Sequence, residues 1–293
     1  SLLTLKQRCA RGLYSALLRA LTPVYLARLW WRGRAEPLYR HAWSQRLGWY
    51  GAGAPAGDGW VWVHAVSLGE TRAATALIDA LRQRWPGMRL LLTNTTATGR
   101  EAGQALLHEG DAQVWLPYDT PGATRRFLRR YRPAVGVLME TEVWPNLQAA
   151  AMQLGVPMVL ANARLSDKSL RQGLRFAALL RPAAQALSLT LAQTPDDARR
   201  LQQAGAPLVS VVGNLKFDVL PSEHLLQRGL AWKRLAKRPV VLAASTREGE
   251  EAALLQAWCE LPPPRPLLLL VPRHPQRFDE VAMQVEKSGL TLQ

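Results

Sequence analysis

The chain has 293 residues, 48% of them hydrophobic, which is enough for two domains with buried cores and excludes general disorder. Its net charge of +15 favours an anionic partner: nucleic acid, an anionic membrane surface or a phosphorylated substrate. The two cysteines, Cys9 and Cys259, lie far apart and have neither metal-binding nor redox spacing. No cluster of His, Cys, Asp or Glu has metal-ligand spacing either, so we expect no metal site, and we assign no cofactor to the chain.

Residues 1–34 differ from the rest of the chain. Apolar residues recur at helical spacing between Leu13 and Val24, and basic residues are interspersed among them. Arg19 and Arg28 interrupt every run that could reach the roughly 18 apolar residues of a membrane-spanning helix. The pattern is typical of a basic amphipathic helix that lies in a membrane surface. It fits equally well an amphipathic helix that packs on its own domain.

The aromatic-rich apolar run at residues 60–66 predicts a buried strand. It ends at Ser67 and Gly69, and Glu70 is then expected in the first turn of a helix that extends past Leu81. A strand, a turn and a helix in this order place the turn at the carboxyl edge of a parallel sheet, where open α/β folds bind ligands. Glu70 has two interpretations there: it complements the helix dipole, or it acts as a general base in a cleft.

Strand and helix patterns alternate after this point, which predicts an α/β fold with a parallel sheet covered by helices on both faces. The predicted strands lie at residues 89–92, 113–116, 135–139, 158–160, 187–192 and 209–212. The predicted helices between them lie at residues 121–131, 144–154, 169–180 and 195–204. A charged stretch at residues 217–238 is expected to be an irregular connection, and a second alternating unit begins with strands at 239–244 and 266–271.

Polar loops follow these strands. In the first unit they occupy residues 93–99, 140–146, 162–166 and 213–218; in the second they occupy residues 244–251 and 272–278. Because carboxyl ends of parallel strands meet at one edge, we expect each set to form a ligand site. Arg273 and His274 precede a helix start, which suits a phosphate or carboxylate. If the two edges face each other across a cleft, a nucleotide on the second domain meets a base from the first.

These motifs, in this order from Trp60 to Phe278, resemble the 3-deoxy-D-manno-octulosonic acid (Kdo) transferases of lipopolysaccharide biosynthesis. The resemblance implies a GT-B glycosyltransferase with two Rossmann-like domains that face a cleft. It implies inverting, metal-independent transfer of Kdo from CMP-Kdo to the lipid A precursor (lipid IVA). It also implies attachment to the anionic cytoplasmic face of the bacterial inner membrane.

The resemblance also assigns residues. Glu70 matches the general base, Glu140 and Lys216 match positions that support the transition state, and Pro272 and Arg273 match the start of the CMP-binding surface. The remaining nucleotide-binding candidates are His274, Ser245 and Thr246. The acceptor-side candidates are Ser67, Gly69, Arg72, Thr98, Glu142, Asn162 and Arg164.

The predicted organisation has four parts: a membrane-associated helix at 1–34, an acceptor domain at 35–218, a connection at 219–238 and the first part of a nucleotide-binding domain at 239–293. Two features depart from the family pattern: Arg247 stands where many relatives have His, and family members continue beyond the position of Gln293 into a Gly-rich segment. The second domain is therefore expected to be truncated.

Three alternatives remain open at this point. One is another GT-B glycosyltransferase with a different nucleotide-sugar and a lipid acceptor. Another is an inactive, truncated, membrane-bound remnant. The third is a basic nucleic-acid-binding protein, but the arginines are spread along the chain and no recognition motif is present, so we expect no nucleic-acid partner.

Overall fold

A computed structural model describes residues 3–52, 55–219 and 222–291. The outermost ends of the predicted N-terminal helix and second domain, and residues 220–221 of the predicted connection, lie outside the described residues. The chain divides into two compact units, Ser1–Val219 and Leu220–Gln293, and each is described by itself.

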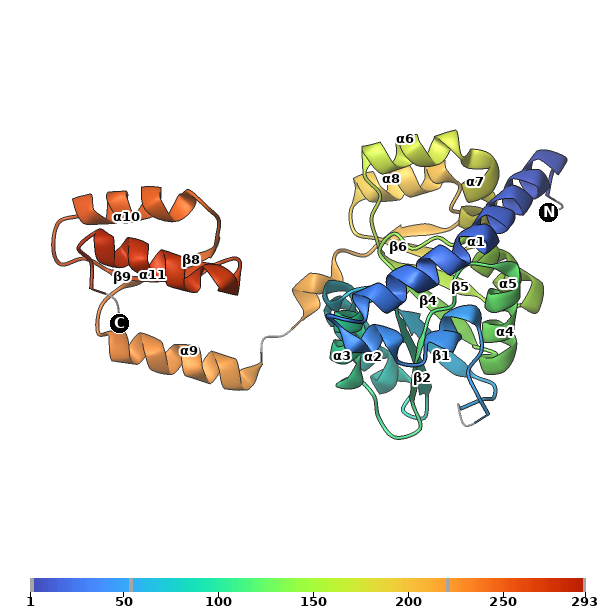
Figure 1. The fold of residues 1–293 in the computed structure, drawn as a ribbon, viewed down its shortest axis with the longest axis horizontal. Coiled ribbons are helices and arrows are strands. Elements are labelled where there is room, and N and C mark those ends of the chain that lie inside the picture. The colour runs from blue at the N-terminus through green and yellow to red at the C-terminus, as the bar shows by residue number, and fades with distance from the viewer. Residues whose placement is uncertain (1–2, 53–54, 220–221, 292–293) are drawn as a thin grey trace. The chain divides into compact units, whose positions relative to one another are not determined.

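The first unit is built on a parallel sheet (Figure 1). Its described strands are β1 (Trp60–His64), β2 (Arg89–Asn94), β3 (Ala112–Trp115), β4 (Val135–Met139), β5 (Met158–Ala163), β6 (Leu189–Ala192) and β7 (Val209–Val211). Their order is β3-β2-β1-β4-β5-β6-β7, and every neighbouring pair is parallel. The predicted α/β class with a parallel sheet is confirmed. The strand order reverses between β1 and β4, which creates a topological switch point there.

Helices connect the strands of this unit. The described helices are α1 (Leu5–Arg32), α2 (Leu68–Arg84), α3 (Ala97–Gln104), α4 (Pro121–Tyr131), α5 (Pro145–Leu154), α6 (Asp167–Arg175), α7 (Ala177–Gln185) and α8 (Pro195–Ala204). Shorter 3-10 turns are η1 (Pro37–Arg40), η2 (Trp43–Leu47) and η3 (Leu215–Asp218). The single helix predicted at residues 169–180 is wrong, because the chain changes direction at Phe176 and forms two helices, α6 and α7.

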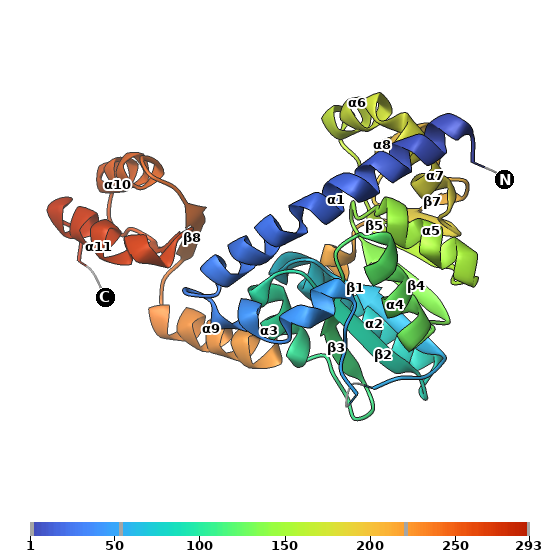
Figure 2. The ribbon, with the colours of Figure 1, turned by 45° about the vertical axis from the view of Figure 1, so that its right-hand side comes forward.

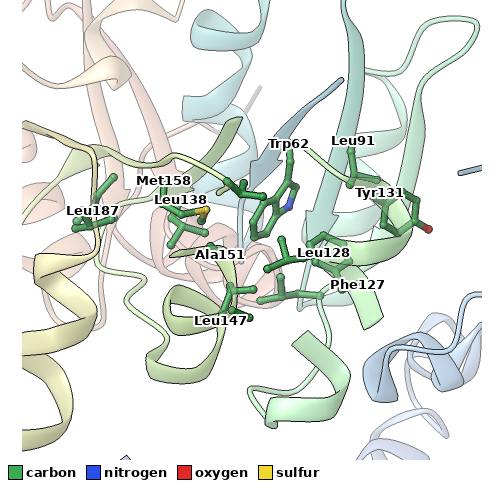
Figure 3. Close-up of a cluster of buried hydrophobic side chains, with 14 of the residues drawn as sticks. Trp62, Leu91, Phe127, Leu128, Tyr131, Leu138, Leu147, Ala151, Met158 and Leu187 are labelled. Carbon is green, nitrogen blue, oxygen red and sulfur yellow. The ribbon is translucent and has the colours of Figure 1, made fainter. Parts of the chain in front are cut away.

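Two apolar cores cover the two faces of the sheet. On one face Trp62 packs edge-on against Phe127 of α4, with ring centroids 4.9 Å apart, and Leu147 of α5 belongs to the same cluster (Figure 3). On the other face, Val63 packs with Ile78 of α2. Alternate residues of β1 point to opposite faces, so one short strand contributes to both cores. This double burial explains why its sequence is continuously apolar.

Helix α1 begins with a capping box, in which Thr4 and Gln7 exchange hydrogen bonds. It lies against α5 and α7 (Figure 2) and buries Ser15 and Leu29. Within the part of the chain that the structure describes, no helix is sufficiently long and apolar to cross a membrane. The contacts with α5 and α7 show that one face of α1 packs on its own unit. This is the second of the two alternatives predicted for this segment.

The second unit contains α9 (Glu223–Ala236), β8 (Val240–Thr246), α10 (Glu250–Glu260), β9 (Leu267–Pro272), η4 (Pro275–Arg277) and α11 (Phe278–Lys287). Strands β8 and β9 pair in parallel. The irregular structure predicted for residues 217–238 is wrong, because η3 and the 14-residue helix α9 occupy most of this stretch. Good helix formers dominate this stretch, and its charge obscured that signal.

Candidate functional site

Glu70 lies in the first turn of α2, directly after β1. Ser67 caps this helix, since its hydroxyl accepts a hydrogen bond from the Glu70 amide at 3.4 Å. The Glu70 carboxylate turns back and accepts a hydrogen bond from the Val66 amide at 2.8 Å. A Cβ added at Gly99 would lie 2.9 Å from the Val66 carbonyl, so glycine permits α3 to approach the loop. The Glu70 side chain is thus held at the carboxyl edge of the sheet.

The pKa of Glu70 is raised above its usual value. Burial is the main cause, because it disfavours the charged carboxylate, and the negative charge of Glu140 adds to it. The hydrogen bond from Val66 and the positive charges of Arg164 and Lys216 act in the opposite direction. A carboxylate with a raised pKa accepts a proton more readily, which is what a general base requires.

Glu140 follows β4, the strand next to β1 across the switch point. Its backbone has φ of 60°, in the left-handed region, and its side chain is 7% exposed. The carboxylate accepts a hydrogen bond from Arg164 Nε at 3.0 Å and forms an ion pair with Arg164 Nη2 at 2.8 Å, and Lys216 Nζ lies 3.5 Å away. Left-handed backbone at a non-glycine residue is uncommon and concentrates at functional sites. Glu140 thus gathers two cations at the sheet edge.

Lys216 lies in η3, whose position is fixed by a network of side-chain amides. Asn162 accepts a hydrogen bond from the Leu215 amide at 3.0 Å, and Asn214 accepts one from the Lys216 amide at 3.0 Å. Gln193 accepts a hydrogen bond from Asn214 and donates one to the Asn162 carbonyl, which closes the network. Asn162, with φ of 51°, is therefore a positioning residue for the lysine loop.

Glu142 is the third carboxylate of this region. Burial, and then the negative charge of Glu70, raise its pKa to about 7. Near neutral pH Glu142 therefore exchanges between its neutral and ionised forms. The structure brings together five of the predicted residues: Glu70, Glu140, Glu142, Arg164 and Lys216.

The other acceptor-side candidates lie around this group. Gly69 and Arg72 are exposed in and just after the first turn of α2. Thr98 is exposed in the first turn of α3, but the cap of that helix is Thr96, whose hydroxyl accepts a hydrogen bond from the Gly99 amide. The side chains of Arg72 and Thr98 make no hydrogen bond or ion pair within the described residues, so they are free to contact a ligand.

The nucleotide-binding candidates lie together at the carboxyl ends of β8 and β9. Pro272 and Thr246 are buried, whereas Arg273, His274 and Ser245 are exposed. The Arg273 amide donates a hydrogen bond to the Thr246 carbonyl at 2.9 Å. Arg277 pairs with the fully buried Glu251 at 2.8 Å, which ties the loop after β9 to α10.

Asp119 is a structural residue that sequence reasoning missed. Its carboxylate accepts hydrogen bonds from the Asn146 and Leu147 amides at the start of α5 and from the Tyr14 hydroxyl of α1. Burial raises its pKa to about 7. The sequence carries no signal for this role, because an aspartate before a helix predicts only a local turn, whereas Asp119 binds the start of a helix that is distant in the chain.

Among the residues that the structure describes, no group of three or more His, Cys, Asp or Glu side chains has an arrangement that could hold a metal ion.

A family model described as 3-deoxy-D-manno-octulosonic-acid transferase matches residues 41–219. This range contains all the residues gathered around Glu70 and Glu140. The chain belongs to the Kdo transferase family. A curated Kdo transferase from Bordetella pertussis is 51% identical over 292 residues, which are 96% of this chain and 68% of that protein. The chain spans about two thirds of the length of this relative and of those from Haemophilus influenzae and Arabidopsis thaliana, and about half of the length of several relatives from Rickettsia.

Solved structures share the fold of this Kdo transferase family member. A UDP-GlcNAc 2-epimerase from Neisseria meningitidis, bound to UDP-GlcNAc, matches with a TM-score of 0.55 and 18% identity over 79% of this chain and 70% of that one. A glycosyltransferase from Rickettsia africae matches with a TM-score of 0.51 and 12% identity over 80% of this chain and 66% of that one. At these identities the likeness concerns the fold.

Proposed function

We propose that this Kdo transferase family member transfers Kdo from CMP-Kdo to the phosphorylated lipid A precursor, with inversion and without a metal ion. The observation that carries the proposal is the pair of glutamates at the switch point. Glu70 is a half-buried carboxylate without a cationic hydrogen-bond partner among the described residues, and Glu140 near it holds Arg164 and Lys216. A base and a cluster of cations on one sheet edge are the two elements that an inverting transfer needs.

In this mechanism Glu70 takes the proton from the acceptor hydroxyl as that oxygen attacks the anomeric carbon of Kdo. The bond from that carbon to the CMP phosphate oxygen breaks, and CMP leaves as a phosphate monoester. Lys216, held by Glu140 and the amide network, stabilises the carboxylate of Kdo or the departing phosphate. Arg273 and His274 at the carboxyl end of β9 are assigned to the nucleotide.

We further propose that the protein works on the cytoplasmic face of the inner membrane. The face of α1 that points away from its unit carries an exposed apolar stripe at helical spacing, including Leu13 at 75% and Trp31 at 66% exposure. Arginines flank this stripe, which suits an anionic lipid surface. An apolar cavity of about 190 Å³, lined by Arg164, Leu170 and Leu174, offers space near Glu140 for an acyl chain.

The test is a transfer assay with the purified protein in detergent micelles that contain lipid A precursor. CMP-Kdo, generated in situ, is compared with UDP-GlcNAc as donor, each with and without EDTA. The proposal predicts release of CMP and a product heavier by one Kdo, unchanged by EDTA. Transfer from UDP-GlcNAc alone would instead support the alternative of another lipid glycosyltransferase, and no transfer from either donor would support a remnant.

A further inference from the structure

Another cavity, of about 140 Å³ and with a polar lining, lies beside the loop that precedes Glu70 and is formed entirely by the first unit. The second half of α1 provides one wall, with Tyr25, Arg28 and Arg32. The turn η2 contributes Arg46, and the loop after β2 contributes Thr95. A single water molecule needs about 10–15 Å³ of such a cavity, so the cavity has room for a larger polar group.

Arg46 is the central feature of this cavity, because it is a buried cation without an anion. Its residue is 3% exposed, and its guanidinium donates to the Thr95 carbonyl at 3.1 Å and stacks on Trp115 at 4.2 Å. Within residues 3–52, 55–219 and 222–291, no carboxylate forms an ion pair with it, and its Nε has no hydrogen-bond partner. Burying a charge without a counter-ion is costly, so this site is expected to receive one.

The charges of the neighbouring arginines indicate what that counter-ion is. Arg32 is 3.8 Å from Glu36, on a surface where both side chains are 42% exposed. Arg28 forms no ion pair in the part of the chain that the structure describes. The cavity thus has three guanidinium groups, of Arg28, Arg32 and Arg46. The single carboxylate of Glu36 leaves two of their positive charges without a counter-ion. A phosphate monoester carries between about −1.5 and −2 at neutral pH, so it balances them, whereas a single carboxylate does not.

The hydroxyl groups of the cavity fit the same ligand. The Thr95 Oγ1 is buried and has no hydrogen-bond partner among the described residues. The phenol rings of Tyr25 and Tyr118, 5.7 Å apart, belong to the same lining, together with Leu29 and Tyr39. Guanidinium groups bind phosphate through paired N–H donors, and hydroxyls bind its remaining oxygens. A tetrahedral anion can use donors that converge from several walls in this way.

Val66 connects the cavity to Glu70 through its backbone carbonyl and amide groups. The Thr95 amide donates to the Val66 carbonyl at 3.4 Å, while the Val66 amide donates to the Glu70 carboxylate at 2.8 Å. We propose that this cavity binds a phosphate monoester on the sugar acceptor and thereby places the acceptor hydroxyl near Glu70. This assignment rests on the proposed function. Because α1 supplies four of the lining residues, the bound phosphate also holds α1 against the sheet.

The experiment measures binding first, without any transfer. Titrations of inorganic phosphate and of glucosamine 1-phosphate are followed by calorimetry on the full chain, its Arg28→Gln and Thr95→Val variants, and an Arg34→Gln control. Arg34 is exposed, carries the same charge and does not line the cavity. We expect saturable binding that weakens about tenfold in Arg28→Gln and several-fold in Thr95→Val, with Arg34→Gln unchanged. Equal binding by all four proteins would overturn the site, whether or not the chain transfers Kdo.

Vesicles distinguish the two possible sources of the phosphate. Phosphatidylcholine vesicles that contain phosphatidic acid, which is a phosphate monoester, are compared with vesicles that contain phosphatidylglycerol at equal charge. If Arg28→Gln and Thr95→Val weaken only the binding to phosphatidic acid and not to glucosamine 1-phosphate, a lipid headgroup is the ligand and the acceptor assignment is wrong. If the assignment holds, both variants raise the KM for the acceptor and keep kcat within about threefold.

Discussion

Glu70, in the first turn of α2 after β1, and Glu140, directly after β4, both lie at the switch point of the sheet, but their carboxylates have different partners. Glu140 is bound by Arg164 and lies 3.5 Å from Lys216. Glu70 accepts a hydrogen bond only from the Val66 amide among the described groups, and burial raises its pKa. A carboxylate neutralised by cations is a poor base and a good anchor, whereas a buried one without such partners is a good base. We therefore propose opposite roles for these two identical side chains, which follow neighbouring strands.

The largest expected effect comes from Glu70→Gln, which removes the proton acceptor and preserves the shape of the side chain. We expect kcat to fall about 10²- to 10⁴-fold, with little change in the KM of either substrate. Since the base must be ionised and its pKa is raised, the kcat/KM of the unchanged protein decreases as pH falls through a value above the usual glutamate pKa. Steady-state rates from pH 4.5 to 8 measure both effects. A variant that retains its rate would restrict Glu70 to complementing the helix dipole.

Glu140→Gln should have a smaller effect on catalysis and a measurable effect on stability. The variant releases Arg164 and Lys216, so the cations become less well placed and kcat falls about tenfold to a hundredfold. Both cationic side chains are more than half exposed, and the loss of stability is therefore limited to about 1 kcal/mol. Urea unfolding and kcat of the two Gln variants, measured side by side, test the contrast. Equal losses of kcat with equal stabilities would remove the distinction between base and anchor.

The protonation of Glu142 provides a sharper test of the charge on Glu70. Its pKa of about 7 depends on burial and on the negative charge of Glu70, so Glu70→Gln should lower it. Carbon NMR of labelled glutamate side chains across pH 5 to 9 measures the midpoint directly. An unchanged midpoint in Glu70→Gln would mean that Glu70 is neutral or remote from Glu142.

The same group makes the free energy of unfolding depend on pH. The folded pKa of about 7 exceeds the usual 4.5, so the folded state holds this proton more tightly. The contribution of Glu142 to the free energy of unfolding is therefore fully present below pH 4.5. It is lost as the pH rises to about 7, and the loss is at most about 3 kcal/mol. Urea unfolding at pH 5 and 8 should show this decrease, and Glu142→Gln should reduce it.

The sequence predicted much of this site because its residues follow apolar runs. The run before Ser67 and the run before Glu140 both became strands, and their carboxyl ends carry the catalytic candidates. What the sequence could not predict was that β1 pairs with β4, because strand order depends on tertiary packing. The amide network that holds Lys216 was also missed, since Gln193, Asn162 and Asn214 meet only when β5, β6 and η3 are side by side. Arg46 was missed for a related reason: its burial depends on Trp115, which is 69 positions away in the chain.

The smallest expected effects concern the two hydroxyls that shape the Glu70 loop. Ser67 accepts one long hydrogen bond, 3.4 Å from the Glu70 amide. Thr96 accepts a hydrogen bond from the Gly99 amide at 3.1 Å and donates one to the Val66 carbonyl at 2.9 Å. The Val66 amide donates the hydrogen bond to the Glu70 carboxylate. Thr96 therefore helps to position Glu70 by holding Val66 in place. We therefore expect Ser67→Ala to cost about 0.5 kcal/mol of stability and Thr96→Ala about 1 kcal/mol or more.

The same order should hold for catalysis, with Thr96→Ala lowering kcat more than Ser67→Ala and Thr96→Ser close to the unchanged protein. The serine control keeps the hydroxyl and removes only a methyl group, so it separates the two hydrogen bonds from packing. Thermal unfolding and kcat of the three variants give the comparison. If Ser67→Ala proved the more damaging change, the Glu70 carboxylate would be positioned by its own helix cap, and the contact between α3 and Val66 would be packing alone.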